Sequence, residues 1–240
     1  MGRTGNRSAA PNLEKPKCSL KTVVERLARV YAPSQGLTDP LALIVWENIG
    51  YLIDDGRRTA LLEEFRDRIG LEAAKIATAP NAILSDIARR GGINALARSE
   101  RLRRIGEIAV AECEGDLSSH LRMLPVPKAR ALLKKFPAIG DPGADKILLL
   151  SGIAPLPTVD SNGLRTMVRL GYCLEENSYG QTYKSAAAVL GLAGQSDSDW
   201  LARAYGLLRE HGKALCKRAA PVCEPCPLDH ICAHRITPKL

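Results

Sequence analysis

The spacing of side chains along the chain constrains the fold most. Ala, Leu, Arg and Glu recur at intervals of three and four residues, whereas runs of alternating Val, Ile or Thr are missing. The first pattern is typical of amphipathic α-helices, and the second would be needed for half-buried strands. Aromatic residues make up only 4% of the chain, and a hydrophobic content of 45% suffices for a core. The sequence therefore predicts an all-α protein.

A series of helices joined by short loops is expected. The first, over 20–31, carries a single apolar stripe. The second, over 41–53, is apolar on most sides and is bounded by Pro40 and the Asp54-Asp55 pair, so we expect a buried central helix. Further helices are predicted at 58–69, 81–90, 99–113, 128–136, 143–152, 161–171, 184–193 and 198–213.

The net charge bears on the partners of the protein. A formal charge of +8 favours polyanions, with nucleic acid as the first candidate, although a basic composition needs a motif to support it. No run of about 18 apolar residues occurs, and residues 1–17 lack the apolar core of a signal peptide. We expect a flexible arm over 1–17, a cytoplasmic protein and no membrane partner.

Four of the seven cysteines lie in the segment CKRAAPVCEPCPLDHIC. Cys216, Cys223, Cys226 and Cys232 follow the spacing Cys-x6-Cys-x2-Cys-x5-Cys. Disulfides are not expected in a reducing cytoplasm, and neighbouring thiolates repel one another unless a metal centre neutralises them. The alternatives are an iron-sulfur cluster, a zinc site and four unrelated buried cysteines. Zinc ribbons usually carry two Cys-x2-Cys pairs, whereas this segment has one, which favours the cluster.

This spacing resembles the four-iron, four-sulfur (4Fe-4S) loop of endonuclease III and its relatives, the helix-hairpin-helix DNA glycosylases. The resemblance implies that the four cysteines hold a 4Fe-4S cluster, for which we expect a structural rather than an electron-transfer role. It also implies that the loop between the first two ligands presents Lys217 and Arg218 to the DNA backbone.

A second motif lies in LLKKFPAIGDPGADKILLLSG, which predicts a helix ending near Phe136, a turn, and a helix starting near Gly143. Glycines let a phosphate approach the backbone, and the free N–H groups at a helix start favour an anion. A plain helical hairpin is the alternative. The segment resembles the family's hairpin, here at 130–152, and the resemblance implies DNA contacts by Ile139, Gly140 and Gly143.

The segment PTVDSNGLRTMVRLGY follows this hairpin, and Asp160 in it matches the family's catalytic aspartate. Breaking an N-glycosidic bond builds positive charge on the sugar, so a nearby carboxylate stabilises this charge or activates water. The alternative is that Asp160 only caps the helix that begins at Ser161, and both roles can coexist.

One departure from the family pattern bears on the reaction. Bifunctional members carry a lysine nucleophile in the hairpin, and Pro142 stands at the matching position. Lys146 lies four residues further along the helix, so we do not expect it to form a Schiff base. Ala138 also replaces a usual glycine. The resemblance is therefore to a monofunctional enzyme, similar to the adenine-removing mismatch glycosylases.

A second carboxylate, Glu47, lies in the apolar run VWENIGYLID and matches the catalytic glutamate of those adenine-removing enzymes. A buried carboxyl group there could protonate the departing base; a salt bridge to a neighbouring arginine is an equal alternative. Tyr51 is expected either to line the base pocket or to fill the core. Ile93, in the loop RRGGINA, matches the apolar wedge that relatives insert into the duplex, or is simply an exposed loop residue.

These features together predict a monomeric base-excision repair glycosylase that acts on double-stranded DNA with a damaged or mismatched base, with a weak preference for purines. The resemblance implies a two-lobed fold: a six-helix barrel over 32–154, and a cluster lobe from 18–31 and 155–240. A bifunctional glycosylase that uses another lysine and a non-catalytic iron-sulfur DNA-binding protein are the alternatives.

Overall fold

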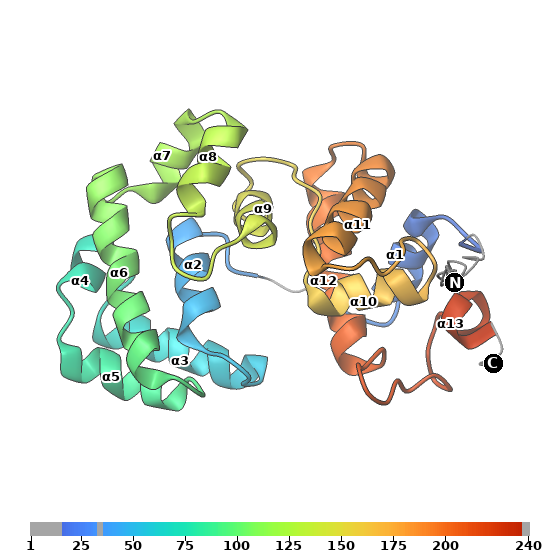
Figure 1. Ribbon diagram of the computed structural model, residues 1–240, viewed down its shortest axis with the longest axis horizontal. Helices are drawn as coiled ribbons and strands as arrows, with labels where there is room; N and C mark the ends of the chain where they lie inside the picture. Colours follow the sequence, from blue (N-terminus) through green and yellow to red (C-terminus); the bar gives the residue numbers. More distant parts are fainter. Residues whose placement is uncertain (1–15, 33–35, 237–240) are drawn as a thin grey trace, which may run out of the picture. The chain divides into compact units, whose positions relative to one another are not determined.

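The computed structural model describes residues 16–32 and 36–236, and these residues form helices and loops with no strand (Figure 1). The all-α prediction is confirmed. The expected arm over 1–17 lies almost wholly outside the described residues. The helices are α1 (Leu20–Ala28), α2 (Pro40–Ile49), α3 (Asp55–Arg68), α4 (Ala73–Ala77), α5 (Asn81–Arg90), α6 (Ala95–Cys113), α7 (Leu117–Met123), α8 (Val126–Leu133), α9 (Asp141–Leu150), α10 (Ser161–Arg169), α11 (Tyr179–Gly194), α12 (Ser198–Ala214) and α13 (Ala233–Ile236), with a short 3₁₀ turn at Asp229–Ile231.

The described residues divide into two compact units. The barrel unit comprises the described part of Ser34–Thr158 together with Gly194–Ala202. The cysteine unit comprises the described parts of Met1–Pro33, Val159–Ala193 and Arg203–Leu240. Each unit is considered by itself below.

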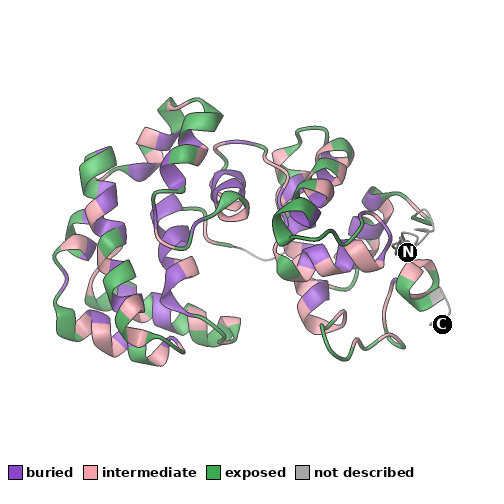
Figure 2. Ribbon diagram, in the orientation of Figure 1, coloured by how far each residue is buried: buried purple, intermediate pink, exposed green. Residues whose placement is uncertain are grey.

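The core of the barrel unit is built around α2. Eight of the ten residues of α2 are buried, and Figure 2 shows that the helix is buried along most of its length. It packs against α3, α6, α7 and α9, while α6 also packs against α4 and α5. Gly106 allows the contact with α4, because a Cβ there would lie 2.3 Å from the Ala77 nitrogen. The expected central helix is therefore present.

Short polar side chains set where several of these helices begin. Asp39 Oδ1 accepts a hydrogen bond from the Ala42 nitrogen at 2.7 Å, and Pro40 occupies the first turn of α2, where no N–H is needed. Asp54 caps α3 in the same way, through the Arg57 nitrogen at 2.9 Å. These caps are the boundary signals that the sequence carries.

The end of α2 differs from the expected position near residue 53. The helix stops at Ile49, and Gly50 is extended with φ −146°. The Tyr51 nitrogen then donates to the Gly91 oxygen at 2.8 Å, and Tyr51 pairs with Gly92 in an isolated parallel bridge. The helix thus ends because Tyr51 pairs with a segment forty residues further along the chain.

The two hairpin helices, α8 and α9, pack against each other, but their bounds differ by two to three residues from the expected ones. The first ends at Leu133 instead of near Phe136, and the second starts at Asp141 instead of Gly143. The earlier start follows from Pro142, which the first turn of a helix accommodates without loss of a hydrogen bond.

In the cysteine unit, α10 and α12 lie unusually close together. A Cβ on Gly163 would lie 2.5 Å from Val159 Cγ2 and 3.3 Å from Leu208 Cβ. A Cβ on Gly212 would lie 2.5 Å from the Asn162 oxygen. The two glycines therefore allow α12 to pack on the start of α10. Among the described residues, no helix combines the length and the apolar character needed to cross a bilayer.

Candidate functional site

Asp160 sits at the N-cap of α10, immediately after the segment that follows the hairpin. Its Oδ1 accepts hydrogen bonds from the nitrogens of Asn162 at 3.0 Å and Gly163 at 2.8 Å. Its Oδ2 accepts from Asn162 Nδ2 at 3.1 Å, and the side chain is 22% exposed. The helix start therefore fixes one carboxylate oxygen and leaves the group reachable from solvent.

Two further side chains surround Asp160 within the cysteine unit. Arg209 Nε, from α12, lies 3.3 Å from Asp160 Oδ2, and its own side chain is only 24% exposed. Tyr179, at the start of α11, has a pKa raised by burial and then by the negative charge of Asp160. Neither residue was singled out in the sequence, because each comes from a distant helix with no motif of its own.

Glu47 forms an ion pair with Lys146, which joins α2 to α9 in the barrel unit. The lysine side chain is 11% exposed and the glutamate 26%. The pairing that the sequence suggested for Glu47 is thus present, with a lysine in place of an arginine. Lys146 reaches this carboxylate because it lies one helical turn beyond Pro142, on the same face of α9.

The turn of the hairpin has the conformation of a glycine turn although it lacks the glycine. Ala138 has φ +59°, in the left-handed region. Ile139 is 5% exposed as a whole residue, and its nitrogen donates to the Phe136 oxygen at 3.3 Å. Gly140 is extended at the N-cap of α9 and supplies no side-chain cap. Gly143 lies in the first turn, and a Cβ there would be 3.4 Å from Ile139 Cγ2.

The structure brings the Tyr51 and Ile93 loops together. The Tyr51–Gly92 bridge joins the α2–α3 loop to the α5–α6 loop. Tyr51 is 58% exposed and Ile93 54%. Asn94 has φ +58°, and the Ile93 oxygen accepts from Arg98 Nη2 at 2.6 Å. Two expected DNA-contacting residues therefore lie exposed on adjoining loops.

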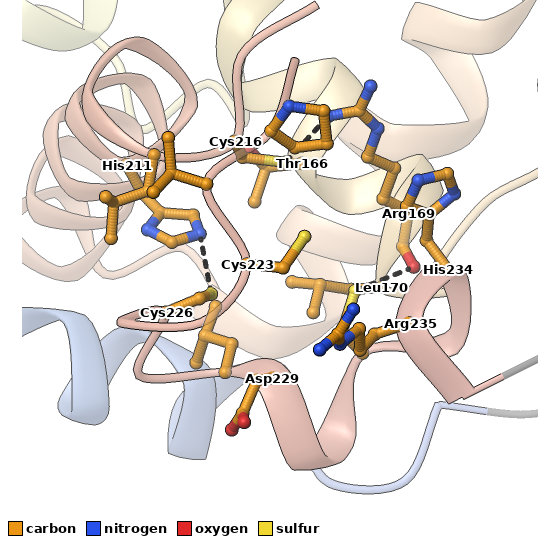
Figure 3. Close-up of a pocket in the computed structure, with 15 residues that line it drawn as sticks. Thr166, Arg169, Leu170, His211, Cys216, Cys223, Cys226, Asp229, His234 and Arg235 are labelled. Atoms are coloured by element: carbon orange, nitrogen blue, oxygen red, sulfur yellow. Dashed lines mark hydrogen bonds between the residues drawn. The ribbon is translucent and has the colours of Figure 1, made fainter.

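The four clustered cysteines line one pocket of the cysteine unit (Figure 3). The pocket encloses about 400 Å³, open solvent included, and its wall also contains Arg169 of α10 and His211 of α12. In chain order the cysteines are Cys216, Cys223, Cys226 and Cys232. Each is partly buried, and none is in a disulfide.

The sulfur atoms face the same pocket but are not gathered on one point. Among the described residues, no three His, Cys, Asp or Glu side chains are close enough to hold a single metal ion. A tetrahedral zinc would need sulfurs about 3.8 Å apart, given Zn–S bonds of about 2.3 Å. In a polynuclear cluster each thiolate binds a different iron, which requires a wider set. The four sulfurs therefore line one pocket without forming the ligand set of a single ion in the described part of the chain.

Polar groups of α10 and α12 contact the sulfurs. Arg169 Nη1 donates to Cys216 Sγ at 3.3 Å, and Cys232 Sγ donates to the Arg169 oxygen at 3.5 Å. His211 Nε2 lies 3.7 Å from Cys226 Sγ (Figure 3). Burial lowers the pKa of His211 to about 4 and raises that of the Cys226 thiol to about 11.

The loop between the first two cysteines is held through its backbone. Arg169 Nη1 donates to the Lys217 oxygen at 2.7 Å, and Nη2 donates to the Arg218 oxygen at 3.1 Å. Arg165 Nε donates to the Cys216 oxygen at 2.8 Å. The side chains of Lys217 and Arg218 remain exposed. The two α10 arginines were missed in the sequence, where nothing distinguishes them from other helical arginines.

Comparison with known proteins finds similar structures but no similar sequence. No protein-family model and no curated protein sequence matches the chain. A trapped endonuclease III–DNA covalent intermediate matches with a TM-score of 0.71 at 16% identity, covering 91% of this chain and 97% of that one. A thermostable thymine-DNA glycosylase matches with a TM-score of 0.67 at 17% identity, covering 90% and 96%.

A third solved structure, an H. pylori 3-methyladenine DNA glycosylase bound to 1,N6-ethenoadenine, has a TM-score of 0.61 at 15% identity, covering 82% of this chain and 95% of that one. Likeness at such low identity is a statement about the fold. The protein therefore has the all-α helix-hairpin-helix fold of endonuclease III, with a strongly diverged sequence.

Proposed function

We propose that this protein is a base-excision repair DNA glycosylase that hydrolyses the N-glycosidic bond of a damaged or mismatched base. The observation that carries the proposal is the placement of Asp160 at the start of α10, directly after the hairpin, in a chain with the fold of endonuclease III. The net charge of +8 supports double-stranded DNA as the substrate.

Asp160 is the catalytic residue of this proposal. Because Oδ1 is held by two backbone N–H groups, the carboxylate has a fixed orientation. A carboxylate so oriented can stabilise the positive charge that develops on the sugar, or can orient a water for attack. Arg209 Nε, 3.3 Å from Oδ2, holds the second carboxylate oxygen from the side of α12.

We propose hydrolysis without strand cleavage. Pro142 offers no amine at the position that a nucleophilic lysine occupies in bifunctional relatives. Lys146 is one turn deeper and already holds the Glu47 carboxylate. Glu47 is the second candidate catalytic group, which would act on the departing base, and its match to the adenine-removing enzymes gives the weak preference for purines.

The proposed DNA contacts fall into two kinds. The hairpin turn at Ile139, Gly140 and Gly143 would hold a phosphate at the start of α9, and Lys217 and Arg218 would contact the DNA backbone from the cysteine loop. Tyr51 and Ile93, which are exposed and lie on adjoining loops, would enter the duplex beside the extruded nucleotide. The bridge that joins the two loops supports this assignment.

We further propose that Cys216, Cys223, Cys226 and Cys232 hold a 4Fe-4S cluster. Four thiols around one pocket, too dispersed for one ion, have the chemistry of this group. When bound, it would tie the C-terminal loop together through four thiolate bonds, the first from Cys216, two residues after the end of α12. Arg169 would donate to a ligand sulfur and fix the loop that carries Lys217 and Arg218.

The test of function is a panel of duplexes that each carry one lesion or mismatch, incubated with the whole protein and then treated with or without alkali. We expect strand breaks only after alkali, and none with Asp160→Asn at unchanged DNA affinity. Breaks without alkali, together with a borohydride-trapped complex, would establish the bifunctional alternative. Tight binding with no base released from any duplex would favour the non-catalytic alternative.

The test of the cofactor is iron and acid-labile sulfide analysis of anaerobically purified protein. We expect about four of each per chain, and loss of both with Cys226→Ser. Cys18→Ser is the matched control, because Cys18 lies in the same unit but does not line the pocket. Stoichiometric zinc without sulfide would contradict the proposal.

A further inference from the structure

Three arginines of the barrel unit carry a positive charge that no carboxylate balances. Arg58 of α3 and Arg98 and Arg101 of α6 form no ion pair within the described residues. The only hydrogen bond of their guanidinium groups to the described protein is the one from Arg98 Nη2 to the Ile93 oxygen. Arg58 Nε and Arg98 Nη1 are buried without a partner. We call this set the arginine triad.

The backbone at the Tyr51–Gly92 bridge brings the triad together. A Cβ on Gly50 would lie 3.5 Å from Arg58 Nε, and a Cβ on Gly91 would lie 3.2 Å from Arg98 Nε. The Gly91 oxygen accepts from the Tyr51 nitrogen, so these two glycines lie on adjoining segments. Arg101 follows Arg98 by three residues on α6 and therefore shares its face.

Burial makes the unbalanced charge costly. Arg98 is 4% exposed, and its pKa is lowered by burial and then by the charges of Arg101 and Arg58. Elsewhere in the unit, Arg90 makes two contacts of 2.6 Å with Glu64, although it is more exposed. A buried guanidinium without a counter-charge destabilises the free protein, and an anion that binds there relieves this cost.

The triad also has access to solvent. Arg101 is exposed, and Arg58 is half-buried, with its guanidinium 5.4 Å from the centroid of Trp46. Stacking on an aromatic ring holds an arginine in a fixed position without using its N–H donors. Arg58 and Arg101 can therefore contact an anion directly. The buried charge of Arg98 attracts the same anion without contacting it.

We propose that the arginine triad binds a phosphodiester of the DNA strand at the foot of the Gly91–Asn94 loop. This step rests on the proposed DNA substrate, and adds to it a phosphate contact beside Tyr51 and Ile93. Arginine donors suit phosphate oxygens, and a phosphate held next to an inserted side chain fixes the duplex while a nucleotide leaves the stack.

The first experiment measures the affinity of the whole protein for an undamaged duplex as a function of salt. Loss of one phosphate contact lowers the slope of log K against log salt by about 0.9. We expect this decrease for Arg58→Gln/Arg101→Gln, with a loss of affinity on the order of tenfold at low salt. Arg66→Gln is the control, since it removes an exposed charge from the same helix as Arg58. The proposal would be overturned if Arg66→Gln decreased the salt slope, per charge removed, as much as Arg58→Gln/Arg101→Gln does.

The second experiment separates a DNA phosphate from a free one. In a Trp200→Phe background, inorganic phosphate is titrated while the fluorescence of Trp46, the neighbour of Arg58, is followed. We expect weak phosphate binding that duplex DNA displaces. Phosphate binding that DNA does not displace, combined with an unchanged salt slope in the double variant, would assign the triad to a free anion and overturn the proposal.

Arg98→Met distinguishes a ligand site from a structural clamp. We expect an unchanged or higher melting temperature, because an unbalanced buried charge is removed, together with weaker DNA binding. A lower melting temperature with normal DNA binding would show that Arg98 serves only to hold the Ile93 oxygen. None of these measurements requires base release. A protein that releases no base but shows the expected salt slopes would contradict only the glycosylase proposal. A protein that releases a base but shows unchanged salt slopes in the double variant would contradict only the proposed phosphate site.

Discussion

Lys146 of α9 is ion-paired with Glu47 of α2, and both side chains are more than two-thirds shielded from solvent. The pair places an amine and a carboxylate together in the barrel unit, where the sequence had suggested an arginine as the partner of the carboxylate. Removing one partner of such a pair leaves the other charge poorly solvated, so the two residues should be coupled in stability whatever their part in the reaction.

We expect Glu47→Gln and Lys146→Met each to lower the free energy of unfolding by about 1–3 kcal/mol, less than for a fully buried pair because Glu47 retains some exposure. The double variant should cost about 1 kcal/mol less than the sum. Urea unfolding of the four proteins measures this coupling; additive losses would show that the pair is unimportant. Lys146→Met should retain base release. If Lys146 were the nucleophile, this substitution would abolish base release.

Two substitutions of Asp160 separate its structural role from its chemical one. Asparagine caps a helix about as well as aspartate, so Asp160→Asn should unfold at nearly the wild-type urea concentration. Asp160→Ala loses both backbone hydrogen bonds and should cost about 1 kcal/mol. Both should lose base release. Full activity in the asparagine variant would reduce Asp160 to a helix cap.

The all-α class could be anticipated because it depends on local signals, and the helix-hairpin-helix fold because short motifs resemble those of a known family. The apolar stripe of α1, the Pro40 start of α2 and the cysteine spacing all act within a few residues, whereas α9 starts at Asp141, two residues before the expected Gly143. The partners of the site could not be anticipated in the same way. Arg209 reaches Asp160 from forty-nine residues further along the chain, and no periodic pattern records such a contact.

The bridge between Tyr51 and Gly92 illustrates the same limit for secondary structure. The apolar run up to residue 53 has the composition of a helix, yet the chain leaves the helix at Gly50. A Cβ at Gly50 would lie 2.4 Å from Ile53 Cδ1, so the glycine permits a tight turn that the hydrophobic pattern alone does not indicate. Tertiary contact here overrides local propensity.

The ion-pair network on α3 and α5 predicts a pH dependence. Hydrogen bonds from Arg90 and then Arg68 lower the pKa of Glu64 from 4.5 to about 2. Because the folded-state pKa is depressed, the stabilisation is fully present above pH 4.5 and is lost as the pH falls toward 2. Unfolding measured across this window should show a smaller pH slope for Glu64→Gln than for wild type. Glu63→Gln, an exposed neighbour, is the control and should retain the wild-type slope.

A substitution in the turn of the hairpin should stabilise the protein, whereas those of Glu47, Lys146 and Asp160 should destabilise it or leave its stability unchanged. Ala138 has φ +59°, a conformation that costs a residue with a Cβ about 1 kcal/mol relative to glycine. Ala138→Gly should therefore raise the free energy of unfolding by up to about 1 kcal/mol, which corresponds to a rise in melting temperature of about 2–4 °C for a chain of this size. Ala138→Val should lower it, since a β-branched side chain tolerates the left-handed region poorly. If instead glycine destabilises the protein, the entropy that it adds to the unfolded chain outweighs the strain, and the alanine at this turn is a stabilising departure from the family pattern.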